Sequence, residues 1–302
     1  MIPQKVKVGK QVDLVTSINK YIVANYDADC YSSDVESFLS EVQQNRNVIS
    51  HIFDLKTVDT LKANKEIMIH YANQLAQLRN KMTFGKGADN VTIEFKWTDI
   101  FKDGNWTSYS IQFEYYSVLF NLAMVYYLLG IETTKDQLDD VTLKEGIKFY
   151  QYAAGIFNLI KEEIPSNINP QDRPIDLDPS FMSYCVHICT ALAQILLIKV
   201  AESKKTGNNL QAQLAKAVEN SFRTASSMLE NASFKRYIDD TWKLLVSNRA
   251  NYYQAKAYAK MRDFALDEFK KTGKDFLKNI QKYWLCILII ICGSLILSLL
   301  LL

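Results

Sequence analysis

The chain has 302 residues, of which 48% are hydrophobic and 23% charged, a balance that excludes a disordered protein and predicts one large or two ordinary domains. The formal net charge of +2 creates no strong overall field, so we expect no nucleic-acid partner. The first ten residues are polar, which predicts no signal peptide and therefore a cytosolic protein with reduced thiols.

The first third of the chain is expected to form three helices and one extended segment. The helices are predicted within residues 1–28, at about 32–53 and at about 58–82, where apolar residues recur at steps of three and four. Residues 91–97 alternate apolar and polar side chains and are rich in β-formers, which predicts a short strand. Residues 99–110 are expected to form a loop that turns at Asp103 and Gly104.

The stretch from Ser110 to Gly130 is apolar on every helical face and is the expected core helix. Phe113, Phe120 and Tyr127 recur at helical spacing, and other apolar residues fill the remaining faces. Glu114, Asn121 and four tyrosines lie within the stretch, so we expect protein and not lipid around it. A buried Asn121 must bond to backbone groups of a neighbouring element, and Gly130 is the expected C-terminal cap.

The second half of the chain is expected to form antiparallel helical hairpins without a strict repeat. An acidic connector from Glu132 to Asp140 leads into them, and four of the five prolines fall between residues 165 and 179. Asp178 before Pro179 is typical of a capped helix start. The predicted helices span about 142–163, 179–204, 210–229 and 234–272, the last ending at Gly273.

Residues 285–302 form a hydrophobic tail without a charged side chain. As a helix it would reach about 27 Å, just short of the ~30 Å hydrocarbon core of a bilayer. Lysines precede it, and Tyr283 and Trp284 stand where interfacial aromatic residues belong. Two alternatives stay equally open: a tail anchor with the domain on the cytosolic side, or translated non-coding sequence. The anchor would include Trp284, Leu285, Ile290 and Leu302.

Few residues have the spacing of a catalytic or metal site. Cys185, His187 and Cys189 are close in sequence, but in a helix the histidine points about 200° from Cys185, so we expect small buried residues there. Asp99 is expected in a loop or cap, and Glu114 as a buried hydrogen-bond partner, in preference to a catalytic carboxylate pair. No Walker or dinucleotide-binding pattern occurs. We predict no catalytic residue, metal or cofactor, and hence no enzyme.

Short pieces spread over about 260 residues carry a resemblance to a known family. They are Met1–Pro3, Val12–Leu14, Tyr71–Leu75, Phe95–Asp99, Phe113–Glu114, Val118–Asn121, Tyr150–Phe157, Leu192–Gln194, Trp242 and Tyr252–Ala257. In order and spacing they resemble the Bro-one domain of Alix, rhophilin and related endosomal adaptors. The resemblance implies a mainly α, banana-shaped domain with tetratricopeptide-like hairpins and no catalytic centre. A small extended element near 91–97 and the hydrophobic C-terminal helix complete the expected fold.

The resemblance fades after about Lys260, which predicts a domain at 1–260, a basic linker at 261–283 and the tail at 284–302. The family's domain continues with further helices that supply one wall of its docking groove. The domain is therefore expected to be incomplete at its C-terminal end.

The resemblance also implies a partner, the C-terminal amphipathic helix of a Snf-seven-type subunit of ESCRT-III, bound on the cytosolic face of endosomal membranes in multivesicular-body sorting. The matching docking residues are Asp140, Lys144, Lys148, Leu197, Leu210 and Leu214. The first three are spaced four apart, as are Leu210 and Leu214, so each set shares a helical face. Spacing alone favours a solvated lysine face and core leucines. An alternative function is a tail-anchored helical scaffold for another partner, such as a small GTPase or a receptor tail.

Overall fold

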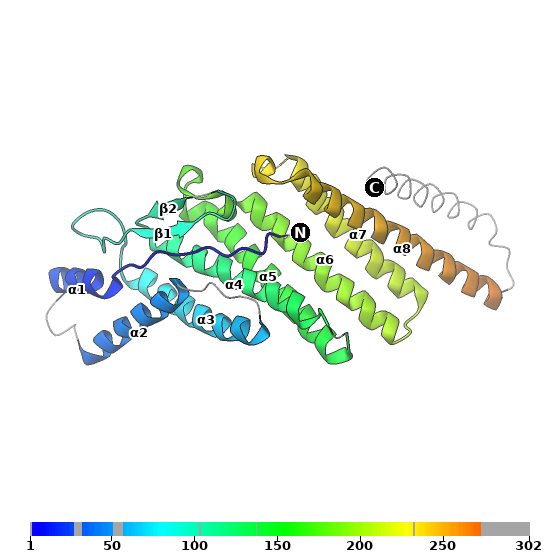
Figure 1. Ribbon diagram of the computed structural model, residues 1–302, viewed down its shortest axis with the longest axis horizontal. Coiled ribbons are helices and arrows are strands. Elements are labelled where there is room, and N and C mark those ends of the chain that lie inside the picture. The colour runs from blue at the N-terminus through cyan, green and yellow to red at the C-terminus, as the bar shows by residue number, and fades with distance from the viewer. Residues whose placement is uncertain are drawn as a thin grey trace. The chain divides into compact units, whose positions relative to one another are not determined.

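The computed structural model describes residues 2–26, 32–50, 57–102, 104–136, 138–231 and 233–272 (Figure 1). The described chain is mainly helical, as predicted, and it divides into two compact units. The first unit holds Pro3–Glu132 and Tyr152–Ser183, and the second holds Met1–Ile2, Thr133–Gln151 and Tyr184–Leu302. The predicted tail and the end of the predicted linker lie outside the described residues, so the anchor stays a prediction.

Three helices open the first unit close to their predicted ranges. They are α1 (Leu14–Asn25), α2 (Ser33–Ser50) and α3 (Val58–Lys81). Side-chain oxygens start two of them: Asp13 accepts from the Thr16 N–H at 3.0 Å, and Thr57 forms a capping box with Thr60. α2 packs between α1 and α3 and buries Leu39 and Val42, so the apolar stripes of these helices form one layer.

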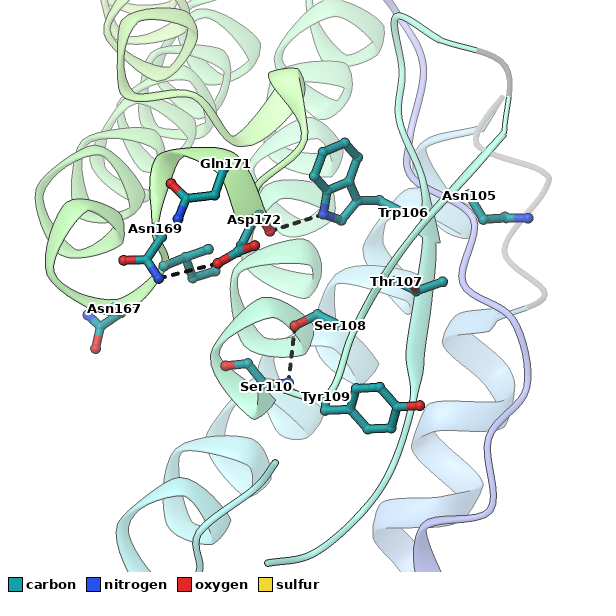
Figure 2. A pocket seen from close by; sticks show the side chains of 11 residues that line it. Asn105, Trp106, Thr107, Ser108, Tyr109, Ser110, Asn167, Asn169, Gln171 and Asp172 are labelled. Atoms are coloured by element: carbon teal, nitrogen blue, oxygen red, sulfur yellow. Dashed lines mark hydrogen bonds between the residues drawn. The ribbon is translucent and has the colours of Figure 1, made fainter. Parts of the chain in front are cut away.

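A β-hairpin replaces part of the predicted loop. β1 (Phe95–Thr98) pairs with β2 (Asn105–Ser108) in an antiparallel register that places Trp97 opposite Trp106. The predicted loop at 99–110 is therefore wrong over β2. Trp106 and Thr107 are good strand formers, and Gly104, with φ of +118°, takes a backbone conformation that other residues avoid. The Trp106 indole N–H donates to the Asp172 carbonyl at 3.0 Å (Figure 2).

The amino-terminal segment lies along the other edge of β1. The Lys10 N–H donates to the Lys96 carbonyl at 2.9 Å, and the Thr98 N–H donates to the Val8 carbonyl at 3.0 Å. Gly9 forms an antiparallel bridge with Trp97. The hairpin is therefore widened on one edge only, which leaves β2 as the outer strand.

Helix α4 (Ile111–Thr133) is the core helix that the sequence predicts. Phe113, Phe120 and Tyr127 are fully buried, and so are residues on its other faces. Gly130 does not cap it: Gly130 is buried inside the helix, which runs on for one turn because the half-buried face continues beyond it. The predicted cap is therefore wrong.

The second unit is built mainly from long helices that follow the predicted hairpin order. The elements after α4 are α5 (Asp140–Asn167), η2 (Pro170–Asp172), η3 (Ile175–Leu177), α6 (Pro179–Ser203), α7 (Asn208–Asn231), η4 (Lys235–Tyr237) and α8 (Asp240–Thr272). α7 and α8 pack along their length, with Arg223 bonded to Gln254 at 2.9 Å and Asn208 to Asp267 at 3.1 Å. These two contacts show that α7 and α8 run antiparallel.

Two helix starts differ from prediction because aspartates cap them. Asp139 accepts from the Val141 and Thr142 N–H groups at 2.9 and 2.8 Å, so α5 begins before its predicted start at Thr142. Asp239 accepts from the Thr241 N–H at 2.7 Å and starts α8 six residues later than Phe234, a segment that forms η4 instead. The predicted start of α6 is confirmed, since Asp178 accepts from the Ser180 N–H at 2.9 Å.

Two helices, α4 and α6, are long and apolar enough to cross a membrane by composition. The protein buries 78% of the apolar window of α4 and 61% of that of α6. Both helices are mostly buried within protein, as core helices are, and the prediction for Ser110–Gly130 made the same choice.

Candidate docking surface

The predicted acidic and basic row lies on the exposed side of the first turns of α5. Asp140, Lys144 and Lys148 are all exposed. Asp140 pairs with Lys144 at 3.2 Å and with Lys204, at the end of α6, at 3.9 Å. No ion pair joins Lys148 to another residue in the described part of the chain. The row therefore presents an excess of positive charge to solvent.

Leu197 lies close to this row, on the neighbouring helix. The contact between Asp140 and Lys204 brings the start of α5 to the end of α6. Leu197 precedes Lys204 by seven residues, so the two side chains share a face of α6. Its side chain is 36% exposed, which is unusual for a leucine in a largely buried helix.

Leu210 and Leu214 lie on the first turns of α7, beside the end of α6. Ser221 donates a hydrogen bond to Gln194 at 3.3 Å, and the short turn between the helices makes them antiparallel. Counting seven residues back along α7 and seven forward along α6 places Leu214 level with Ala201, about one helical turn from Leu197. Leu210 is 48% exposed and Leu214 is half-buried.

The structure therefore brings the six predicted residues to neighbouring stretches of α5, α6 and α7 within the second unit. The exposure of Leu197 and Leu210 disagrees with the alternative that these leucines are core. That the lysines are only a solvated face stays open, and the role of all six residues in binding stays a prediction.

The other residues considered for chemistry have structural surroundings. Cys185 and Cys189 are fully buried free thiols, and burial raises the pKa of each thiol well above its usual value. Within the described ranges, no three side chains of His, Cys, Asp or Glu gather as a metal site would need. Cys30, His51 and the predicted anchor residues Trp284, Leu285, Ile290 and Leu302 lie outside those ranges.

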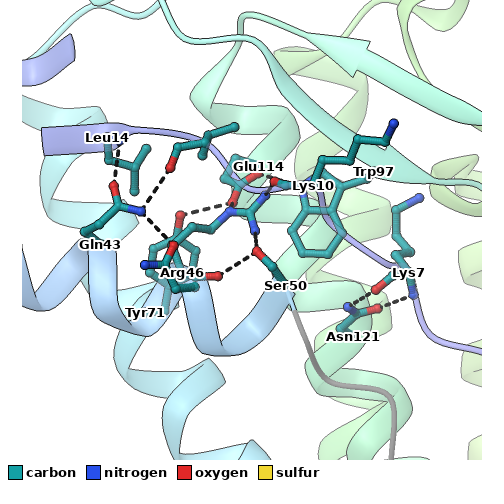
Figure 3. A network of polar contacts seen from close by, with 12 residues as sticks. Lys7, Lys10, Leu14, Gln43, Arg46, Ser50, Tyr71, Trp97, Glu114 and Asn121 are labelled. Atoms are coloured by element: carbon teal, nitrogen blue, oxygen red, sulfur yellow. Dashed lines mark hydrogen bonds and ion pairs between the residues drawn. The ribbon is translucent and has the colours of Figure 1, made fainter. Parts of the chain in front are cut away.

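Sequence reasoning missed a buried ion pair beside α4 in the first unit. The Arg46 Nε lies 2.5 Å from a Glu114 carboxylate oxygen, and both side chains are fully buried (Figure 3). The Nε–H does not point along this line, so the contact is an ion pair without a linear hydrogen bond. Trp97 and Tyr71 donate hydrogen bonds to the same carboxylate at 2.6 and 3.0 Å, which confirms Glu114 as a buried acceptor.

A second buried ion pair holds the amino-terminal segment. The Lys7 Nζ lies 2.6 Å from both carboxylate oxygens of Asp176, which also accepts from the Ile100 N–H at 3.0 Å. Burial raises the pKa of Asp176 to about 6, although Lys7 opposes the shift. The nearby Asp99 accepts from the Phe101 N–H at 2.8 Å and from the Ile175 N–H at 3.1 Å, which confirms its loop role.

The predicted role of Asn121 is also confirmed. Its side chain accepts from the Lys7 N–H at 2.7 Å and donates to the Lys7 carbonyl at 2.8 Å (Figure 3). This paired contact mimics one rung of a strand ladder and fixes the extended amino-terminal segment to the core helix.

Replacing Asn121 with alanine is expected to destabilise the protein by about 1–3 kcal/mol, because two buried backbone groups of Lys7 lose their partner. Urea denaturation measures the change. Ser117→Ala is the matched control on α4, since the buried Ser117 hydroxyl has no hydrogen-bond partner among the described residues. Equal losses for the two variants would contradict the assigned role of Asn121.

Comparison with known proteins places this arrangement in a family. The chain is 24% identical over 250 residues to ALG-2 interacting protein X of Dictyostelium discoideum, covering 82% of this chain and 30% of that protein. It is 25% identical over 269 residues to the vacuolar protein-sorting protein BRO1 of Gibberella zeae, covering 85% of this chain and 25% of that protein. It thus spans about a third or less of the length of these relatives.

The solved complex of the ALIX BRO1 domain with CHMP4C has the same fold. It superposes with a TM-score of 0.75 at 18% identity, covering 95% of this chain and 85% of that chain. The family model described as a BRO1-like domain matches residues 1–276, past the predicted end near residue 260. The chain belongs to the BRO1-like domain family, which confirms the resemblance read from its sequence.

Proposed function

We propose that this protein is a non-enzymatic adaptor that binds the C-terminal amphipathic helix of a Snf-seven-type ESCRT-III subunit at the surface formed by α5, α6 and α7. The observation that carries the proposal is the exposure of Leu197 and Leu210 next to an exposed row with excess positive charge. The complex of the related ALIX domain names CHMP4C as its partner, which supports this class of ligand.

The chemistry of the surface fits an acidic amphipathic helix. Exposed leucines lose unfavourable contact with water when an apolar helical stripe covers them, and this burial supplies most of the affinity. Lys144 and Lys148 would receive acidic residues that flank the stripe, which favours one orientation and speeds encounter. Such an adaptor would act on the cytosolic face of endosomal membranes, where it would recruit or stabilise the polymerising subunit.

The proposal is tested by titrating the purified chain with a synthetic peptide of the CHMP4C C-terminal helix. Leu210→Asp is expected to weaken binding by about 30-fold, because a central apolar anchor is worth roughly 2 kcal/mol and the new carboxylate repels an acidic peptide. Leu210 is a better site than the half-buried Leu214, where a charge would also disturb packing.

Leu245→Asp is the matched control. Leu245 is 41% exposed on α8 in the same unit, and the antiparallel pairing of α7 and α8 places it near the opposite end of α7 from Leu210. It should bind the peptide as the unchanged protein does. The assigned surface is wrong if both variants bind equally well.

A further inference from the structure

The outer edge of β2 offers unpaired backbone groups. In an antiparallel strand the N–H and C=O groups of successive residues point to opposite edges. Lys96 and Thr98 of β1 face the amino-terminal segment, so Phe95 and Trp97 face β2 and pair with Ser108 and Trp106. The backbone groups of Asn105 and Thr107 therefore point outward. They have no hydrogen-bond partner in the described parts of the chain.

A pocket of about 560 Å³ lies along this edge, within the first unit. All six consecutive residues from Asn105 to Ser110 line it. A pocket on one face of a strand would be lined by alternate residues, so this continuous lining shows that the pocket follows the backbone edge.

The opposite wall of the pocket consists of the end of α5 and η2. It is lined by Asn167, Asn169, Gln171 and Asp172, and the Trp106 indole spans the gap to the Asp172 carbonyl (Figure 2). The Asp172 carboxylate is already bonded to the Asn169 amide at 3.2 Å. The wall thus offers uncharged amides and few free charges, with spacing left for one extended chain.

We propose that the outer edge of β2 is a docking site for an extended, uncharged segment of a partner protein, which adds to the hairpin as a further strand. Backbone hydrogen bonds to Asn105 and Thr107 supply the affinity, and the amides of the opposite wall contact alternate side chains of the segment. Because neither wall relies on charge, binding should change little with salt. This separates it from the lysine-bearing surface of α5 to α7.

The test uses a bead-displayed library of seven-residue peptides that lack Asp, Glu, Lys and Arg, selected on the full chain. Thr107→Pro removes the outward N–H without breaking the β1–β2 ladder, since proline is tolerated on an edge strand. Thr107→Val keeps the backbone groups and the shape of the side chain. Selected peptides should bind the unchanged protein and Thr107→Val equally, and Thr107→Pro at least about tenfold more weakly.

A second measurement does not depend on any variant. N-methylation of the peptide, one amide at a time, should abolish binding at alternate positions only, because a paired strand directs every second N–H to its neighbour. Amide hydrogen exchange at Asn105 and Thr107 should slow when the peptide binds. The proposal is overturned if no selected peptide distinguishes Thr107→Val from Thr107→Pro, or if sensitivity to N-methylation shows no period of two.

Discussion

Replacing Arg46 with methionine is expected to lower the free energy of unfolding by about 3–5 kcal/mol, because the Glu114 carboxylate then stays buried without its cation. Arg46 also lies over the Trp97 ring at 4.9 Å and donates to the Lys10 carbonyl at 3.0 Å. One side chain thus links α2, β1, α4 and the amino-terminal segment. The methionine fills similar volume, so the loss reports charge and hydrogen bonding more than packing.

Urea denaturation followed by circular dichroism measures this loss, with Arg79→Met as the matched control. Arg79 lies 3.8 Å from Glu163, and both side chains are partly exposed, so its replacement should cost at most about 1 kcal/mol. In Arg46→Met combined with Glu114→Gln, the carboxylate is neutral, and part of the lost stability should return. A cost for Arg46→Met no larger than that for Arg79→Met would show that the buried pair contributes little.

The fold was largely predictable because its strongest signals are local and periodic. The helix around Phe120 is apolar on every face, and such a segment can only be buried or in lipid. Asn121 is the single amide in the run from Val118 to Leu129, so its pairing with a neighbouring backbone could be expected from the sequence alone. The family resemblance added the docking residues, which spacing alone would have assigned to core and solvated surface.

The missed features depend on contacts between residues far apart in sequence. Arg46 occupies one position of an ordinary amphipathic helix, and nothing in the sequence relates it to Glu114 across 68 residues. Lys7 lies in a polar segment and pairs with a residue 169 positions away. A local signal did exist for two other misses: Asp139 and Asp239 each precede a helix and are followed by threonine, a pattern that indicates an N-cap.

Gly9 shows how tightly these distant parts fit. A Cβ at this position would lie 2.9 Å from both terminal nitrogens of Arg46, closer than real Cβ atoms approach. The backbone of the amino-terminal segment can therefore lie against the guanidinium only with glycine there. In the sequence this glycine resembles a simple break between polar residues.

Replacing Lys7 with methionine is expected to destabilise the protein by about 3–5 kcal/mol near neutral pH, because it leaves the Asp176 carboxylate buried without a cation. Only the hydrogen bond from the Ile100 N–H would remain to it. The surface pair of Lys243 with Asp240, whose carboxylate side chain is 94% exposed, supplies the control. Lys243→Met should cost at most about 1 kcal/mol.

The loss caused by Lys7→Met should depend on pH in a defined direction. Burial already raises the pKa of Asp176 to about 6, and removing Lys7 removes the charge that opposes this shift, so the pKa rises further. An acid whose folded-state pKa is raised binds its proton more tightly in the folded protein, so its cost appears only as the pH rises through that value. Denaturation at pH 8 and pH 5 should therefore show a larger loss at pH 8. Lys7→Met combined with Asp176→Asn should lose this dependence, and an equal loss for Lys7→Met at both pH values would rule out Asp176 as its cause.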